Sequence, residues 1–208
     1  MIKNNSVILF QGDSVTDAER DREDPISLGI GFPAIICGIL HATYPEANYK
    51  ILNRGISGNR AADMAARWQT DCLDLKPDVL TILCGVNESG RRYDSNDPTP
   101  DDVFKENVRQ LILSAKAVSN PDLVLITPFL IDINDTVAQV HEDVYGKVAM
   151  MKELAEEFNA PLIDLDQIFL EASKHMPMTF WAKDGVHPTT AGHSLIAYHW
   201  LKAAGFSL

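Results

Sequence analysis

Short apolar segments that alternate with longer amphipathic segments are the feature of this 208-residue sequence that most restricts its fold. The short segments are continuous or nearly continuous in apolar residues, which is typical of parallel strands buried on both faces. Five strands are predicted on this basis, at residues 6–10, 49–52, 79–84, 123–127 and 162–165.

The longer segments carry apolar residues at helical spacing. One helix is predicted to take Thr99 as its N-cap and Pro100 as its first residue, because Phe104, Val108 and Leu111 follow at helical intervals. Further helices are predicted at residues 31–44, 59–68, 140–158 and 193–201. An alternation of strands and helices favours one parallel sheet with helices on both faces. We therefore predict a single α/β domain that spans residues 1–208.

The net charge and the cysteine content restrict the kinds of molecule and compartment that suit this protein. The formal net charge of -11 would repel nucleic acid and anionic membranes, and it suits a neutral substrate. The sequence shows no signal-peptide or membrane-spanning segment, so we expect a cytoplasmic protein. Cys37, Cys72 and Cys84 are odd in number and widely spaced. This pattern predicts buried free thiols in a reducing compartment, with no disulfide framework and no zinc site.

Polar residues gather directly after three predicted strands and before the last predicted helix. The four clusters are residues 12–14, 53–58, 85–87 and 184–187. Because the carboxyl ends of parallel strands meet at one edge of a sheet, segments far apart in sequence are expected to form one site there.

The residues in these clusters are the types that ester hydrolysis needs: a nucleophile, a base and donors for the oxyanion. Ser14 is the candidate nucleophile and His187 the candidate base, with Asp184 able to hold the imidazole tautomer. Backbone N–H groups of Ser14 and Gly58 and the amide of Asn87 are candidate oxyanion donors.

Each of these residues also fits a purely structural role. Gly-Asp-Ser is a common turn composition, Asn87 can cap or turn the chain, and Gly58 can start a helix. Asp184 and His187 are conceivable metal ligands, but no third ligand is close in sequence, so we predict no metal and no cofactor. The joint pattern, at one edge of the sheet, favours the hydrolytic site.

Together the four segments resemble the GDSL/SGNH hydrolase family. The motifs are GDSVTD at residues 12–17, NRGISGN at residues 53–59, GVNE at residues 85–88 and DGVHP at residues 184–188. The family often has Asp after the Asn of the third motif, where this chain has Glu88.

The resemblance implies a flavodoxin-like, three-layer α/β/α sandwich with a five-stranded parallel sheet. It implies that Ser14 is the nucleophile, that His187 is the base and that Asp184 is its partner. It also implies an oxyanion hole formed by Ser14, Gly58 and Asn87.

A narrower resemblance concerns the substrate. The run NRGISGNRAADMAARW, the TPF segment and the HPTTAGH segment look like those of bacterial acetylxylan esterases. This resemblance implies a small acetylated oligosaccharide as the substrate. Three alternatives stay open: a lysophospholipase or thioesterase with a longer acyl pocket, an acetyltransferase of the same fold, and a non-catalytic carbohydrate-binding protein.

Candidate substrate-binding residues are Arg91 and Tyr93, expected on the loop after Asn87, and Trp181. All three can reach the edge of the sheet, and an aromatic platform suits a sugar ring. Phe180 and Trp181 also fit packing against neighbouring helices or a contact between subunits, so a homo-oligomer stays open.

Overall fold

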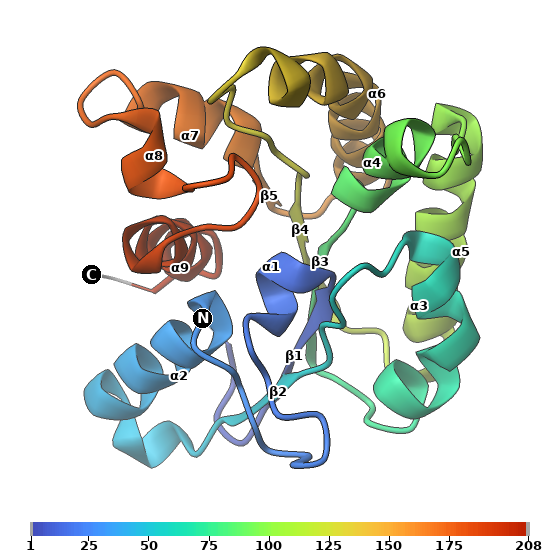
Figure 1. Ribbon diagram of the computed structural model, residues 1–208. Coiled ribbons are helices and arrows are strands. Elements are labelled where there is room, and N and C mark those ends of the chain that lie inside the picture. The colour runs from blue at the N-terminus through green and yellow to red at the C-terminus, as the bar shows by residue number, and fades with distance from the viewer. Residues whose placement is uncertain (1, 207–208) are drawn as a thin grey trace.

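A parallel five-stranded sheet forms the centre of the molecule in the computed structural model, which describes residues 2–206 (Figure 1). The strands lie in the order β2-β1-β3-β4-β5, and every neighbouring pair is parallel. Their bounds are β1 Val7–Gly12, β2 Lys50–Asn53, β3 Val79–Leu83, β4 Asp122–Ile126 and β5 Leu162–Ile163. All five predicted strands are confirmed, and β1 extends beyond its predicted end to Gly12.

Helices cover both faces of the sheet, which confirms the expected three-layer arrangement (Figure 1). One face is covered by α2 Phe32–Thr43, α7 Leu165–Ala172 and α9 Thr190–Ala203. The other is covered by α3 Ala61–Trp68, α5 Asp101–Val118 and α6 Asp135–Glu157. The strand order is that of flavodoxin-like folds, as the family resemblance implied.

The other helical segments lie between these elements along the chain. They are α1 Ser14–Asp17, α4 Val86–Asp94, α8 Met178–Trp181, the 3-10 helix η1 Pro45–Ala47 and the π-helix η2 Gln69–Leu73. The expectation that Arg91 and Tyr93 lie on a loop is wrong, because both belong to α4. The inward side of α4 includes the polar residues Glu88 and Ser89, so an apolar repeat does not reveal this helix.

The predicted start of α5 is wrong by one residue. Pro100 is the N-cap, and the helix begins at Asp101. The carbonyl of Pro100 accepts the first bond of the helix, from the N–H of Phe104 at 2.9 Å, while its own backbone stays extended. Thr99 therefore lies outside the helix.

Buried tryptophans fix helices in both outer layers. The Trp200 ring of α9 packs against Phe10 of β1 with ring centroids 5.3 Å apart, and its Nε1 donates to Thr81 Oγ1 of β3 at 2.9 Å. On the opposite face, Trp68 Nε1 of α3 donates to the carbonyl of Leu111 in α5 at 3.1 Å. Because a buried N–H needs a partner, each bond favours one position of its helix.

The cysteine thiols are all free, as predicted. Cys72 and Cys84 are buried, whereas Cys37 is only half-buried in α2. Within residues 2–206, no helix has the length and apolar character that a membrane span requires.

Candidate active site

The candidate site lies where β1 separates β2 from β3. Ser14 is the first residue of α1 after β1, and Asn87 is the second residue of α4 after β3. The strand that follows β1 in sequence, β2, lies on one side of it, and β3 lies on the other. Such a switch in strand order leaves a crevice at the carboxyl end of the sheet, because the connections after β1 and β3 leave in opposite directions. Residues 184–188, which precede α9, complete the site from the other end of the chain.

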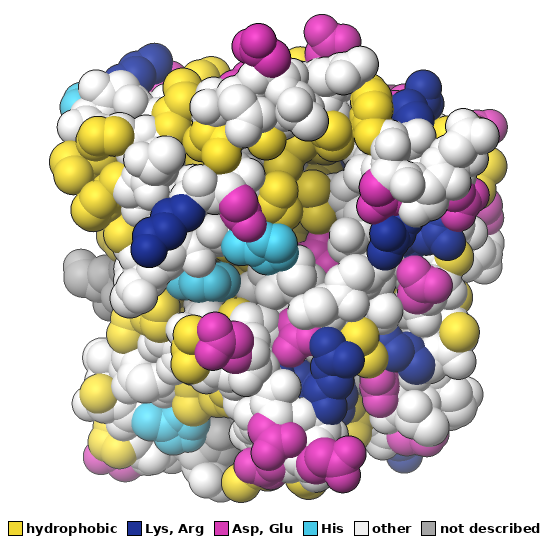
Figure 2. All heavy atoms as spheres, viewed as in Figure 1, with side chains coloured by type: hydrophobic (Ala, Val, Ile, Leu, Met, Phe, Trp, Pro, Cys, Tyr) yellow, Lys and Arg dark blue, Asp and Glu magenta, His cyan; other side chains and the backbone are white. Residues whose placement is uncertain are grey.

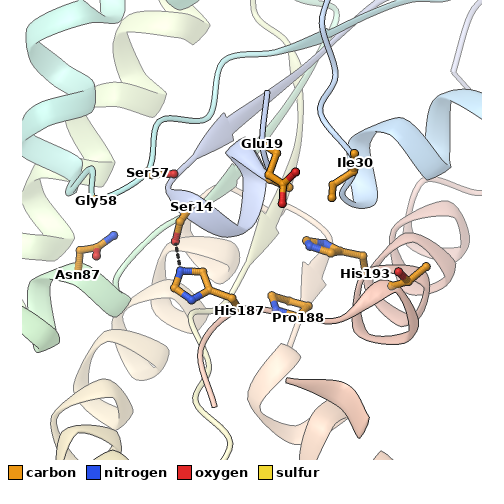
Figure 3. Close-up of a pocket in the computed structure, with 11 residues that line it drawn as sticks. Ser14, Glu19, Ile30, Ser57, Gly58, Asn87, His187, Pro188 and His193 are labelled. Atoms are coloured by element: carbon orange, nitrogen blue, oxygen red, sulfur yellow. Dashed lines mark hydrogen bonds between the residues drawn. The ribbon is translucent and has the colours of Figure 1, made fainter. Parts of the chain in front are cut away.

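Ser14, His187 and Asp184 form a continuous chain of hydrogen bonds (Figure 3). Ser14 Oγ is 2.9 Å from His187 Nε2, and His187 Nδ1 is 2.6 Å from Asp184 Oδ2. A carboxylate only accepts hydrogen bonds, so the ring proton lies on Nδ1 and the lone pair of Nε2 faces the serine. The structure brings the three predicted catalytic residues together in the expected order.

Asp184 is held as the ionised form. Partial burial opposes ionisation, but hydrogen bonds from the His187 ring and from the N–H groups of His187 and Val186 outweigh it and lower the pKa of Asp184. Its Oδ1 accepts from the N–H of His187 at 2.7 Å and of Val186 at 3.0 Å. The same carboxylate therefore folds the turn that carries the base and orients the imidazole.

The segment after β2 is bound to α1 through two side chains. Asn53 Nδ2 donates to the carbonyl of Thr16 at 2.7 Å, and its Oδ1 accepts from the N–H of Gly55 at 2.8 Å. Asp17 Oδ2 accepts from the N–H of Ser57 at 2.8 Å and from its Oγ at 2.9 Å. These bonds set Gly58 beside the nucleophile (Figure 3).

Three hydrogen-bond donors surround Ser14. As the first residue of a helix, Ser14 has an N–H without a partner four residues earlier. Gly58 has φ +83, a left-handed conformation that residues with side chains rarely adopt, and it lines the same cavity as Ser14. The Asn87 amide is held in place by a hydrogen bond, because Nδ2 donates to the carbonyl of Asn59 at 3.0 Å. The three residues predicted to form an oxyanion hole therefore lie together, and their role stays a prediction.

Glu88, the residue that departs from the usual family pattern, is buried and joins two parts of the site. Its Oε1 accepts from the N–H of Ala61 at 2.6 Å, at the start of α3. The longer side chain therefore links the helix that carries Asn87 to the segment that carries Gly58. Burial raises the pKa of Glu88, although the Ala61 N–H acts in the opposite direction.

Two hollows meet at the candidate nucleophile and share Ser14, Asn87 and His187. The main cavity has a volume of about 520 Å³, and its other lining residues are Ala18, Glu19, Ile30, Ser57, Gly58, Pro188, Thr190 and His193. The apolar hollow has a volume of about 440 Å³, and its other lining residues are Val86, Gly90, Tyr93, Asp94, Leu130, Thr136, Val137, Val140 and Val186. Figure 2 shows histidine side chains near the centre of this face, with hydrophobic side chains gathered above them.

The predicted substrate-binding residues have different positions. Tyr93 lines the apolar hollow, and its contact with a substrate stays a prediction. Arg91 is close to Gly58 but lines neither hollow, and its guanidinium pairs with Asp94 at 2.9 Å. Trp181 lines neither hollow because its side chain packs partly buried against the core beneath α9. The position of Trp181 fits the packing alternative, and its contact with a substrate stays a prediction.

Sequence reasoning did not single out two ionisable side chains that line the main cavity. His193 lies in α9, and Glu19 lies two residues after the end of α1. The HPTTAGH segment contained a signal for the first, because His193 follows His187 by six residues on the adjoining helix. Among residues 2–206, no group of three or more His, Cys, Asp or Glu side chains is placed to hold a metal ion.

The geometry is that of a serine hydrolase on a three-layer α/β/α fold. Residues 10–195 match the GDSL-like lipase/acylhydrolase family. An acetylxylan esterase of Geobacillus stearothermophilus is 36% identical over 214 aligned positions, which cover 99% of this chain and 96% of that protein. The chain belongs to the GDSL-like lipase/acylhydrolase family, and it is a carboxylic ester hydrolase.

Solved structures agree with this assignment. The crystal structure of the Geobacillus esterase matches with a TM-score of 0.91 at 34% identity, covering 99% of this chain and 97% of that one. LAE5, an alpha/beta hydrolase enzyme from the metagenome of Lake Arreo, matches with a TM-score of 0.87 at 30% identity, covering 98% and 97%. Alanine variants of a serine, an aspartate and a histidine in the Geobacillus esterase are described as catalytic mutants. That aspartate precedes that histidine by three positions, as Asp184 precedes His187.

The position of Asn87 predicts a large effect on turnover. We expect Asn87→Ala to lower kcat for para-nitrophenyl acetate on the order of a hundredfold, because an oxyanion donor acts mainly in the transition state. Steady-state kinetics would measure it, with Asn107→Ala on α5 as the control. Turnover near the wild-type value in Asn87→Ala would remove Asn87 from the oxyanion hole.

Asp13, beside the nucleophile, predicts a pH-dependent stability. Burial raises the pKa of Asp13 to about 7; the N–H of Val15 opposes this rise and Glu88 adds to it. As pH rises from the pKa of Asp13 in the unfolded state to its pKa in the folded state, the free energy of unfolding falls. The reason is that the native carboxyl still holds its proton where the unfolded one has lost it. We expect Asp13→Asn to raise the free energy of unfolding, by an amount that grows by on the order of 2 kcal/mol between pH 5 and pH 8.

Urea titrations at both pH values would measure this difference. Asp21→Asn is the matched control, since Asp21 is exposed and accepts from the N–H two residues on, as Asp13 does. A constant difference between Asp13→Asn and wild type across this range would contradict the raised pKa.

Proposed function

We propose that this protein removes acetyl groups from acetylated xylo-oligosaccharides through an acyl-enzyme on Ser14. The observation that carries the proposal is the hydrogen-bonded chain from Ser14 through His187 to Asp184, which lies at the junction of two hollows. Similarity to an acetylxylan esterase over nearly the whole chain supports an acetylated sugar as the substrate.

In the acylation step, Ser14 Oγ attacks the acetyl carbonyl carbon while His187 Nε2 takes the hydroxyl proton. The ionised Asp184 stabilises the imidazolium that forms. The carbonyl oxygen becomes an oxyanion and receives hydrogen bonds from Ser14, Gly58 and Asn87. The tetrahedral intermediate then collapses, and the sugar oxygen leaves with the proton from His187.

The second step releases acetate. Water enters the position that the sugar has left, and His187 takes one of its protons as the oxygen attacks the acetyl carbon on Ser14. Ser14 leaves as a hydroxyl after receiving that proton back, which restores the starting enzyme. Every proton moves between Ser14, His187, the sugar oxygen and water, so this chain's own residues complete the reaction.

A second candidate, hydrolysis of esters with longer acyl chains, is favoured by the apolar hollow. Val86, Val137, Val140 and Tyr93 line a volume of about 440 Å³ next to Ser14, which is larger than an acetyl methyl group needs. We place acetyl esters first because the full-length relative is described as an acetylxylan esterase.

The net charge and the free thiols support the kind of substrate and the cellular location that we propose. The net charge of -11 supports a neutral sugar as the partner in place of nucleic acid or an anionic membrane. The three free thiols fit the cytoplasmic location that we propose, which cell fractionation would test.

Acetate release from acetylated xylo-oligosaccharides tests the proposal directly. We expect wild type to release acetate and Ser14→Ala to reduce kcat at least a thousandfold, because the acyl-enzyme cannot form. Ser194→Ala is the control, since Ser194 is an exposed serine of α9 that lines neither hollow. Hydrolysis of aryl acetates without release from any acetylated xylo-oligosaccharide would refute the substrate and keep the esterase.

The dependence of kcat/KM on acyl chain length distinguishes the acetyl esterase from the esterase for longer acyl chains. We expect kcat/KM for para-nitrophenyl esters to fall about tenfold or more from acetyl to butyryl and further to octanoyl. Val137→Ala and Val140→Ala would reduce this fall if the apolar hollow limits the chain. A rate that rises toward octanoyl in wild type would favour the longer-chain alternative.

A further inference from the structure

His193 presents one hydrogen-bond donor to the main cavity. It lies in α9, is buried to 7% exposure, and lines the cavity together with Ser14 and His187. Figure 3 shows its ring extending from the α9 side toward the space between His187 and Glu19. The Asn87 and Gly58 donors lie on the opposite side of Ser14.

The tautomer of His193 is fixed by the backbone of α2. His193 Nδ1 is 3.2 Å from the N–H of Phe32, and an N–H can only donate, so Nδ1 carries a lone pair. The proton of the neutral ring is therefore on Nε2. Of the two ring nitrogens, only Nδ1 has a hydrogen-bond partner among residues 2–206.

The ring is also held in place by packing. It stacks on Phe32 with centroids 6.4 Å apart and an interplanar angle of 22°. A Cβ added at Gly31 would lie 2.9 Å from His193 Cε1, so glycine at this position allows the ring to lie against the backbone. The donor direction is thus set before any ligand binds, which lowers the entropic cost of using it.

His193 stays neutral over the pH range in which a histidine base works. Burial lowers the pKa of His193 to about 4, and the charge of His187 acts in the same direction. A neutral donor suits this position, because a second positive charge would oppose the imidazolium that His187 forms during catalysis.

Glu19 supplies an acceptor to the same cavity. Ala18 and Glu19 have φ values of 40 and 62, two consecutive left-handed residues that end the α1 turn. This backbone directs the Glu19 carboxylate into the cavity, near His193 and Ile30 (Figure 3). A sugar hydroxyl donates one hydrogen bond and accepts others, so a fixed donor beside a carboxylate matches a pair of sugar hydroxyls.

We propose that His193 and Glu19 determine specificity for the sugar part of the ester, with His193 Nε2–H donating to one ring hydroxyl and the Glu19 carboxylate accepting from another. This inference rests on the proposed function and extends it. The sugar lies in the main cavity, and the acetyl methyl group faces the apolar hollow on the other side of Ser14.

The test compares two substrates on each enzyme preparation: acetylated xylo-oligosaccharides and para-nitrophenyl acetate, which has no sugar hydroxyl. The ratio of the two kcat/KM values is independent of the folded fraction. His193→Asn keeps an acceptor for the Phe32 N–H but has no donor that reaches the Nε2 position. We expect its sugar-to-aryl ratio to fall about tenfold, mainly through KM for the sugar.

Three further variants sharpen the result. His193→Gln places an amide donor near the Nε2 position, so we expect it to recover most of the ratio. Glu19→Ala should lower the ratio by a similar factor to His193→Asn, because it removes the acceptor. His199→Asn makes the same substitution at a half-buried histidine of α9 that lines neither hollow, and it should leave the ratio unchanged.

The outcomes are distinct. A wild-type ratio in His193→Asn, which includes an equal loss on both substrates, would overturn the role of His193 in sugar specificity. The proposed function would still stand in that case if wild type hydrolyses the acetylated sugar. If wild type hydrolyses the aryl ester but no acetylated sugar, the proposed function fails and the sugar role fails with it.

Discussion

The parallel pairing of β1 with β2 on one side and β3 on the other is the constraint on which the candidate site depends. It brings the ends of three strands to one edge, so Ser14, Gly58 and Asn87 become neighbours although they belong to separate segments. Asn53 and Asp17 then fix the spacing by hydrogen bonds between the segment after β2 and α1. The proposed oxyanion donors are therefore positioned by the sheet and its first connections before any substrate is present.

The protonation form that each ionisable group at the site favours depends on how deeply the group is buried. Asp184 is half exposed and hydrogen-bonded as the ionised form, so its charge is available to the imidazole. Asp13, Glu88 and His193 are buried, and in each of them burial favours the neutral form. The result is a site in which the ionised Asp184 adjoins His187, while burial favours the neutral form of Asp13, Glu88 and His193.

The sheet and the position of the proposed catalytic residues were predictable from sequence because each has a local signal. Buried parallel strands are apolar throughout, and the polar motifs stand directly after them. The helix α4 has no such signal, since Glu88 and Ser89 occupy its buried side. The orientation of His193 depends on the N–H of Phe32, 161 positions away, and the inward packing of Trp181 depends on α9. Contacts of this kind are created by tertiary packing, so a pattern within one segment does not contain them.

The proposed nucleophile and base, Ser14 and His187, are 173 positions apart, and the strands β2 to β5 lie between them in sequence. During synthesis the serine leaves the ribosome before these four strands and stays without its proposed base until they and the turn at residues 184–187 have followed. We expect a nascent or truncated form that lacks this turn to hydrolyse no ester. The appearance of chemical activity is thereby linked to the formation of the sheet, so partly made molecules do not act on the esters around them.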